Sequence, residues 1–69
     1  MKFQLNGQAY IELNKLLKIM GIVESGGFAN AVITGEEVLV NGQIETRKRK
    51  KLHQGDTVTF ANHTIEIVA

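Results

Sequence analysis

The sequence of 69 residues contains no cysteine, no proline and no tryptophan. Without cysteine, neither a disulfide framework nor a thiolate metal site can form. His53 and His63 are the only histidines, so the usual zinc ligand sets are also missing and we expect no metal or other cofactor. A chain of this length buries only about 60% of its unfolded surface. We therefore expect residues 1–69 to form one domain around one apolar core.

Long apolar runs are missing as well. No segment approaches the roughly 20 consecutive apolar residues of a membrane-spanning helix. The N-terminus, from Met1 to Leu5, has neither the apolar stretch nor the small-residue cleavage site of a signal peptide. These absences predict a soluble, cytoplasmic protein that has no membrane partner, and we expect it to be a monomer.

Basic residues are few but concentrated. Five of the eight are consecutive, namely Arg47, Lys48, Arg49, Lys50 and Lys51, and we call them the basic run. The rest of the chain has three basic and seven acidic side chains, a formal balance of −4, and only Glu45 stands beside the run. Such asymmetry indicates a polyanionic partner. Charge alone does not separate RNA from DNA or anionic lipid, and a solubilising loop or a localisation signal has the same composition.

Helical spacing dominates the first half of the chain. Four apolar residues at i, i+3, i+4 and i+7 share one helix face: Leu13, Leu16, Leu17 and Met20. They predict a helix from Glu12 to Met20, ended by a left-handed cap at Gly21. A short strand around Phe3 and Leu5 is expected before it.

A second helix is predicted to begin after Ser25, a suitable N-cap, and to stop at Gly35. Its buried face would contain Ala29, Val32 and Ile33. Gly26 and Gly27 are poor helix formers, so their place in the first turn needs a reason. Exposed N–H groups at a helix start can bind an anion that glycines allow to come close, and a plain cap is the alternative.

Beyond Glu36 the apolar period changes to two, which is typical of strands. Val38 and Val40 precede Asn41-Gly42, a pair that favours a type I′ hairpin turn with a return strand at Ile44. Apolar alternation predicts a closing hairpin around Asn62-His63, with Leu52 as a separate apolar anchor. The order is strand, helix, helix and four short strands, which predicts a compact α+β domain.

No enzyme constellation is present in the sequence. The histidines lie in expected loop or turn positions, the carboxylates show no acid–base pairing, and Ser25 has no histidine partner nearby in sequence. We predict no catalytic residue, no metal ligand and no small-molecule substrate. Tyr10 and Phe28 are candidate stacking platforms for bases, but a place in the core or at its edge is expected for both.

These pieces, at this spacing, resemble the S-four domain, the αL RNA-binding motif, from about Ile11 to the end of the chain. The matching pieces are Leu13-Asn14-Lys15-Leu16-Leu17-Lys18, Gly21, Ser25, Ala29, Ile33, Gly35, Val38, Val40-Asn41-Gly42 and Gly55-Asp56-Thr57-Val58. The chain resembles free-standing bacterial members of this family, of the YbcJ and YaaA type. Those members share the segments Glu24-Ser25-Gly26-Gly27, Val40-Asn41-Gly42 and Glu45-Thr46-Arg47-Lys48.

The resemblance implies two helices packed on a small twisted, mainly antiparallel sheet. It also implies an L-shaped RNA-binding surface that includes Ser25, Gly26, Gly27 and Asn30 together with the loop from Thr46 to Lys51. Many family members carry basic residues where this chain has Gly26, Gly27 and Asn30, so the basic run would supply the charge here. The expected function is binding of structured RNA, such as ribosomal or transfer RNA, through phosphate contacts. The alternative is a protein-interaction adaptor on a ribosomal or nucleoprotein assembly.

Overall fold

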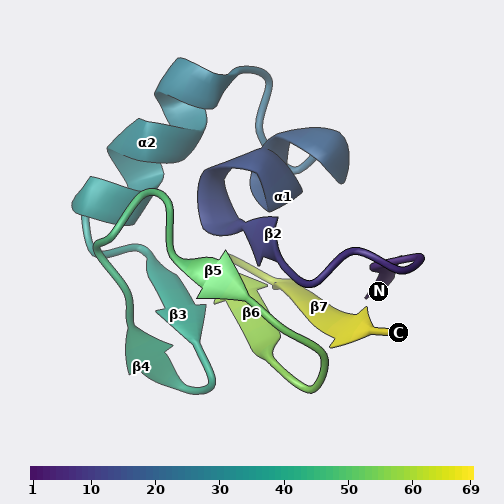
Figure 1. Cartoon of the computed structure of the whole chain (residues 1–69). Coiled ribbons are helices and arrows are strands. Elements are labelled where there is room, and N and C mark those ends of the chain that lie inside the picture. The colour runs from purple at the N-terminus through teal and green to yellow at the C-terminus, as the bar shows by residue number, and fades with distance from the viewer.

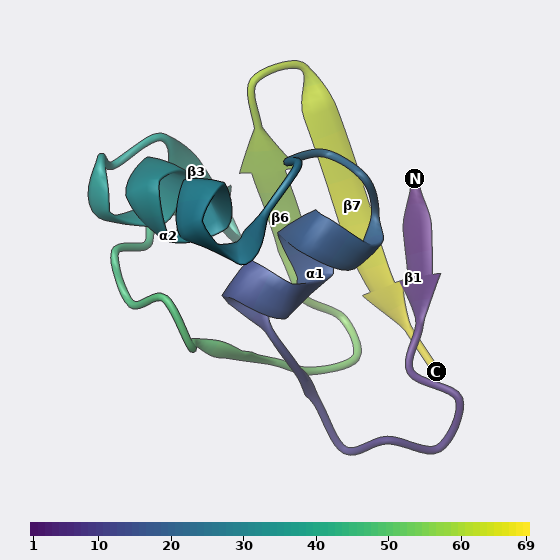
Figure 2. The ribbon, with the colours of Figure 1, turned by 90° about the horizontal axis from the view of Figure 1, so that it is seen from above.

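The computed structural model describes residues 1–69. Helix α1 spans Leu13–Ile19, with Glu12 and Met20 as its caps, and Gly21 follows with a φ of 73°. Helix α2 spans Gly26–Thr34. Both helices and the left-handed glycine after the first are therefore confirmed. Figure 2 shows the two helices on the same side of the sheet.

The N-cap of α2 is also confirmed. The hydroxyl oxygen of Ser25 accepts a hydrogen bond of 3.1 Å from the backbone N–H of Phe28, which otherwise has no partner within the helix. Gly35 ends the helix with a φ of −77°, so this glycine is not left-handed. The left-handed conformation falls instead on Glu36, with a φ of 64°.

The main sheet has five strands in the order β1-β7-β6-β3-β4. Their bounds are Lys2–Gln4 for β1, His63–Val68 for β7, Thr57–Phe60 for β6, Val38–Val40 for β3 and Gln43–Ile44 for β4. Only the β1–β7 pair is parallel. Asn41 and Gly42 join β3 to β4 with φ values of 53° and 83°, as a type I′ turn requires.

Two short strands were not predicted. Strand β2 (Ile11–Glu12) pairs antiparallel with β5 (Lys51–Leu52) in a separate two-stranded sheet. Five strands, and not four, therefore follow the helices. Each of the two has only two residues, too few to show an alternating pattern. Leu52 is fully buried opposite Ile11, so its role as an apolar anchor is confirmed.

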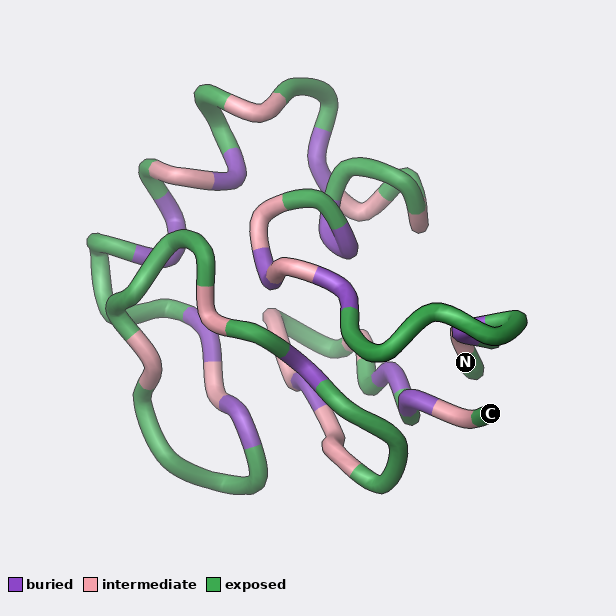
Figure 3. Tube along the Cα trace, in the orientation of Figure 1, coloured by how far each residue is buried: buried purple, intermediate pink, exposed green.

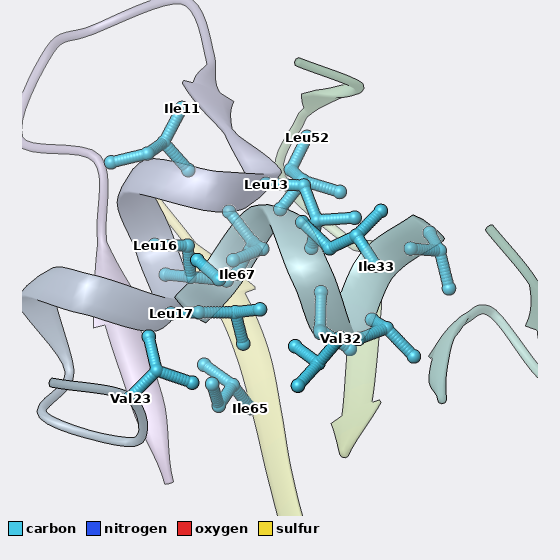
Figure 4. Close-up of a cluster of buried hydrophobic side chains, with 14 of the residues drawn as sticks. Ile11, Leu13, Leu16, Leu17, Val23, Val32, Ile33, Leu52, Ile65 and Ile67 are labelled. Atoms are coloured by element: carbon cyan, nitrogen blue, oxygen red, sulfur yellow. The ribbon is translucent and has the colours of Figure 1, made fainter. Parts of the chain in front are cut away.

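The core lies between the helices and the sheet (Figures 1, 3 and 4). Its 15 buried residues are all hydrophobic, and no polar side chain is buried among them. The predicted helix faces contribute Leu13, Leu16, Leu17, Ala29, Val32 and Ile33. Phe28 and Tyr10 were expected in the core or at its edge, but their exposed fractions are 51% and 36%. This prediction was wrong for Phe28, because the α2 face buried against the core is formed by Ala29, Val32 and Ile33. Neither helix is long and apolar enough to cross a membrane.

Candidate functional site

The basic run connects β4 to β5 and is held by the first turn of α1. The backbone N–H of Leu13 donates to the carbonyl oxygen of Lys50 at 2.9 Å, and that of Asn14 donates to the carbonyl oxygen of Lys48 at 3.0 Å. N–H groups in the first turn have no acceptor within their own helix. The basic run therefore supplies carbonyl acceptors to the first turn of α1. These bonds fix the backbone of the run, while most of its side chains remain exposed.

Two carboxylates hold the two arginines of the run. Glu45 accepts hydrogen bonds from Nε and Nη2 of Arg47 at 2.9 and 3.1 Å. These bonds keep the pKa of Glu45 below its ordinary value and raise that of Arg47. Arg49 Nε lies 3.4 Å from Glu12 Oε2. Glu45 could be identified from the sequence as an acidic neighbour of the run. Glu12 could not, because it is brought next to the run only by the pairing of β2 with β5.

The two paired arginines still face solvent, with 71% and 78% of their side chains exposed. An arginine has five N–H donors, so a carboxylate that occupies one edge leaves donors free for a phosphate. None of the three ion pairs in the structure involves Lys48, Lys50 or Lys51. The run thus combines two oriented guanidinium groups with three lysines that have no acidic partner in contact.

Tyr10 and His53 lie beside the run. Lys51 Nζ is 4.9 Å from the centroid of the Tyr10 ring, which is within cation–π range. The His53 ring lies 6.2 Å from the same ring in a tilted arrangement. The sequence predicts a polar surface or turn residue at His53, and no pattern in it indicates a position beside Tyr10.

Four side chains of the run and His53 line one hollow, which we call the basic hollow. Its volume is about 520 Å³, and none of its lining residues is hydrophobic: Arg47, Arg49, Lys50, Lys51 and His53. Small-molecule pockets are lined predominantly by apolar and aromatic groups. The composition of the basic hollow is instead suited to an anion that brings several negative charges.

The residues expected to contact RNA on α2 fall into two places. Asn30 lies close to the run, because its Oδ1 accepts a hydrogen bond of 3.2 Å from the side chain of Asn14, whose backbone binds Lys48. Ser25, Gly26 and Gly27 form the start of the helix, whereas the run passes its middle and C-terminal part (Figure 1). The structure therefore brings Asn30 and the run together and leaves the helix start as a separate patch.

The fold does not require glycine at the start of α2. A Cβ at Gly26 would meet nothing within 4 Å, and one at Gly27 would meet only the Ser25 hydroxyl at 3.9 Å. Neither residue has a positive φ. The two glycines leave the backbone N–H groups of this turn open to close approach from outside.

A polar network positions the loop that carries His53. Asp56 accepts hydrogen bonds from the His53 backbone N–H at 2.8 Å and from the Asn41 side chain at 3.0 Å. Asn41 in turn accepts from the Thr57 backbone N–H at 2.9 Å. Partial burial alone would raise the pKa of Asp56, but the two hydrogen bonds outweigh it and the pKa is lowered. The ionised carboxylate thus ties the β3–β4 turn to one wall of the basic hollow.

Comparison with known families identifies this arrangement. The S4 domain family model matches residues 3–68. The chain belongs to the S4 domain family. The resemblance seen in the sequence is therefore confirmed, and this S4 domain has relatives of nearly the same length.

YbcJ of Escherichia coli (strain K12) is 45% identical to this S4 domain over 67 residues, which cover 97% of this chain and 96% of YbcJ. RlbA of Bacillus subtilis (strain 168), described as a probable ribosome maturation protein, is 40% identical over 48 residues, 70% of this chain and 68% of RlbA. The solution structure of E. coli YbcJ matches with a TM-score of 0.76 and 44% identity, covering 99% of this chain and 86% of that chain. That structure is described as revealing an αL motif involved in RNA binding. The likeness confirms the predicted fold of two helices on a mainly antiparallel sheet.

Proposed function

We propose that this S4 domain, acting as one unit over residues 1–69, binds structured RNA through phosphate contacts from the basic run. The observation that carries the proposal is the basic hollow, in which four cations and His53 line about 520 Å³ and no lining residue is hydrophobic. Phosphates of a folded RNA strand supply closely spaced negative charges. Arginine can bind phosphate oxygens in pairs, and lysine binds them as a point charge.

The fixed backbone of the run supports tight binding. A mobile loop loses conformational entropy when it binds, which weakens its affinity. Here the hydrogen bonds from Leu13 and Asn14 already hold the run, and Glu45 and Glu12 already orient the two arginines. Much of the ordering has therefore taken place before RNA arrives.

Structured RNA, such as ribosomal or transfer RNA, is the favoured target. Helical RNA is recognised mainly through shape, phosphates and 2′-hydroxyls, because its deep major groove is closed to side chains. The side chains of the basic run make ionic contacts, and Gly26 and Gly27 offer only backbone. We propose that α2, tied to the run through Asn30 and Asn14, fixes the orientation of the domain on the RNA helix. The RNA-binding motif described for YbcJ and the ribosomal role named for RlbA support this choice.

The test compares partners of different classes across a salt series. An RNA hairpin, a DNA duplex of the same sequence and an acidic protein are titrated with the domain. If three to five phosphates are contacted, log affinity for RNA should fall against log salt with a slope of about −2 to −4. Equal or tighter binding to the DNA duplex, or no binding to RNA, would contradict the proposal. Salt-sensitive binding to the acidic protein alone would favour an adaptor on a ribosomal or nucleoprotein assembly.

A further inference from the structure

A second hollow adjoins the basic hollow and has a different lining. It has a volume of about 450 Å³ and shares Arg49 with the basic hollow. Its apolar lining consists of Phe3, Tyr10, Ile11 and Ile19, so we call it the tyrosine groove. Ile19 is 61% exposed, which is high for an isoleucine without a covering partner. The groove is thus an open, partly apolar surface next to a cationic one.

We propose that the tyrosine groove binds an unpaired nucleotide that flanks the RNA helix held by the basic run, with its base stacked on Tyr10. The inference rests on the proposed function and adds the class of RNA: a helix with a single-stranded extension or bulge. A base presents a flat apolar face, a polar edge and a phosphate. The groove offers matching chemistry to each of these three parts.

The aromatic face is provided by Tyr10. The ring lines the groove, whereas Lys51, 4.9 Å from its centroid, lines the basic hollow. The ring therefore stands between the two hollows and keeps a part facing the groove. Stacking on an aromatic side chain is a sequence-tolerant way to bind single-stranded bases. The cation on the other side places a phosphate-binding group within reach of the same nucleotide.

The polar edge of a base would meet Gln8, which lines the groove and makes no side-chain hydrogen bond within the protein. Its amide has both a donor and an acceptor, so it can pair with the edge of any base. The groove lining carries two cations, Lys15 and Arg49, which share the single carboxylate of Glu12, and Lys51 adds a third positive charge on the other side of the Tyr10 ring. A nucleotide phosphate complements this excess. An apolar protein segment would leave it without a counter-charge.

The experiment uses the unmodified chain, because Tyr10 is its only tyrosine and it has no tryptophan. Intrinsic emission therefore reports on Tyr10 alone, and the abasic hairpin measures any change that comes from filling the basic hollow. Two RNA hairpins are compared that carry the same short overhang, one with bases and one abasic, with the overhang placed at either end. After correction for RNA absorbance, the overhang with bases should quench Tyr10 emission more strongly than the abasic one, and it should bind about fivefold to tenfold more tightly. The abasic hairpin keeps every phosphate, so charge does not account for the difference.

Two variants make the assignment specific to the aromatic ring. Tyr10→Leu should bind both hairpins with the affinity of the abasic one, whereas Tyr10→Phe should retain the preference for bases. Equal affinities for the two hairpins and equal emission in the two complexes would overturn the inference and leave the proposed function standing. Quenching of Tyr10 emission by an apolar peptide, and not by the overhang with bases, would also overturn the inference. If neither hairpin binds, the proposed function fails first and this inference fails with it.

Discussion

The start of α2 should become more stable when Gly26 and Gly27 are both replaced by alanine. Glycine in a helix interior is about 0.8–1.0 kcal/mol less favourable than alanine, largely because the flexible unfolded chain is favoured by entropy. Neither position has a positive φ that alanine would resist. The added methyl groups would meet nothing within 4 Å at Gly26 and only the Ser25 hydroxyl, at 3.9 Å, at Gly27.

Since these are the first two residues of the helix, we expect about half of the interior effect from each. The double variant should therefore gain about 1 kcal/mol in free energy of unfolding. For a domain of this size, that corresponds to a rise in Tm of about 4–8 °C. Thermal and urea unfolding followed by circular dichroism measure both quantities. Ala31→Gly, on the exposed side of the same helix, is the matched control and should lower stability by about 1 kcal/mol.

The same variants separate stability from RNA binding. If the RNA backbone comes close to the open N–H groups of this turn, the added methyl groups should weaken RNA binding while they stabilise the fold. Ala31→Gly should change stability only. A double variant that is no more stable than the parent would refute the claim that the fold tolerates side chains here. A more stable variant with unchanged RNA affinity would remove the α2 start from the binding surface.

Three further predictions concern the sheet and its loops. Gly42→Val should lower the free energy of unfolding by about 1–2 kcal/mol, because Gly42 has a φ of 83° and a β-branched residue resists that conformation. An unchanged Tm would argue against the type I′ turn. Ala61→Gly should raise the free energy of unfolding by up to about 1 kcal/mol, because Ala61 has a φ of 54° in the β6–β7 turn. A lower Tm would show that this backbone conformation does not strain Ala61. Asp56 has a lowered pKa, so its contribution to stability is present above its ordinary pKa and is lost as pH falls through the folded-state value. Asp56→Asn should therefore flatten the decline in unfolding free energy below about pH 4. A parallel decline in the parent and the variant would show that the Asp56 carboxylate is not the source of this pH dependence.

The helices and the closing hairpin could be predicted because each buries one face, but the hairpin turn lies at Ala61 and Asn62, and His63, expected in a turn, is the first residue of β7. Leu13, Leu16 and Leu17 repeat at helical spacing, and the structure buries all three. Val58 and Ile65 alternate with polar neighbours, and they pair across β6 and β7. An element that is buried on one side has apolar residues at a regular spacing in the sequence. The bounds of α1 accordingly differ from the prediction by only one residue at each end.

The candidate site could be predicted only in part, because much of it depends on contacts between distant segments. The basic run was evident from composition, but its docking on α1 depends on backbone groups that every residue has. The Arg49–Glu12 pair joins positions far apart in sequence and follows from the unpredicted β2–β5 sheet. Tyr10 joined the candidate surface for the same reason, since Lys51 and His53 reach it across that sheet. Tertiary pairing between two-residue strands leaves no periodic signal.

Two double variants test whether RNA phosphates bind the side chains of the basic run. Lys48 and Lys50 have no ion-pair partner, so replacing them with alanine removes two charges without leaving a carboxylate unpaired. Replacing Lys2 and Lys18 removes the same charge from exposed positions outside the run. The measurement is affinity for an RNA hairpin across a salt series, with circular dichroism to confirm that each protein is folded.

Loss of Lys48 and Lys50 should flatten the slope of log affinity against log salt by about 1.4–1.8, at roughly 0.7–0.9 for each phosphate contact. Loss of Lys2 and Lys18 should leave the slope unchanged. If both folded variants keep the parent slope, or if both lose the same amount, the basic run is not where the RNA phosphates bind.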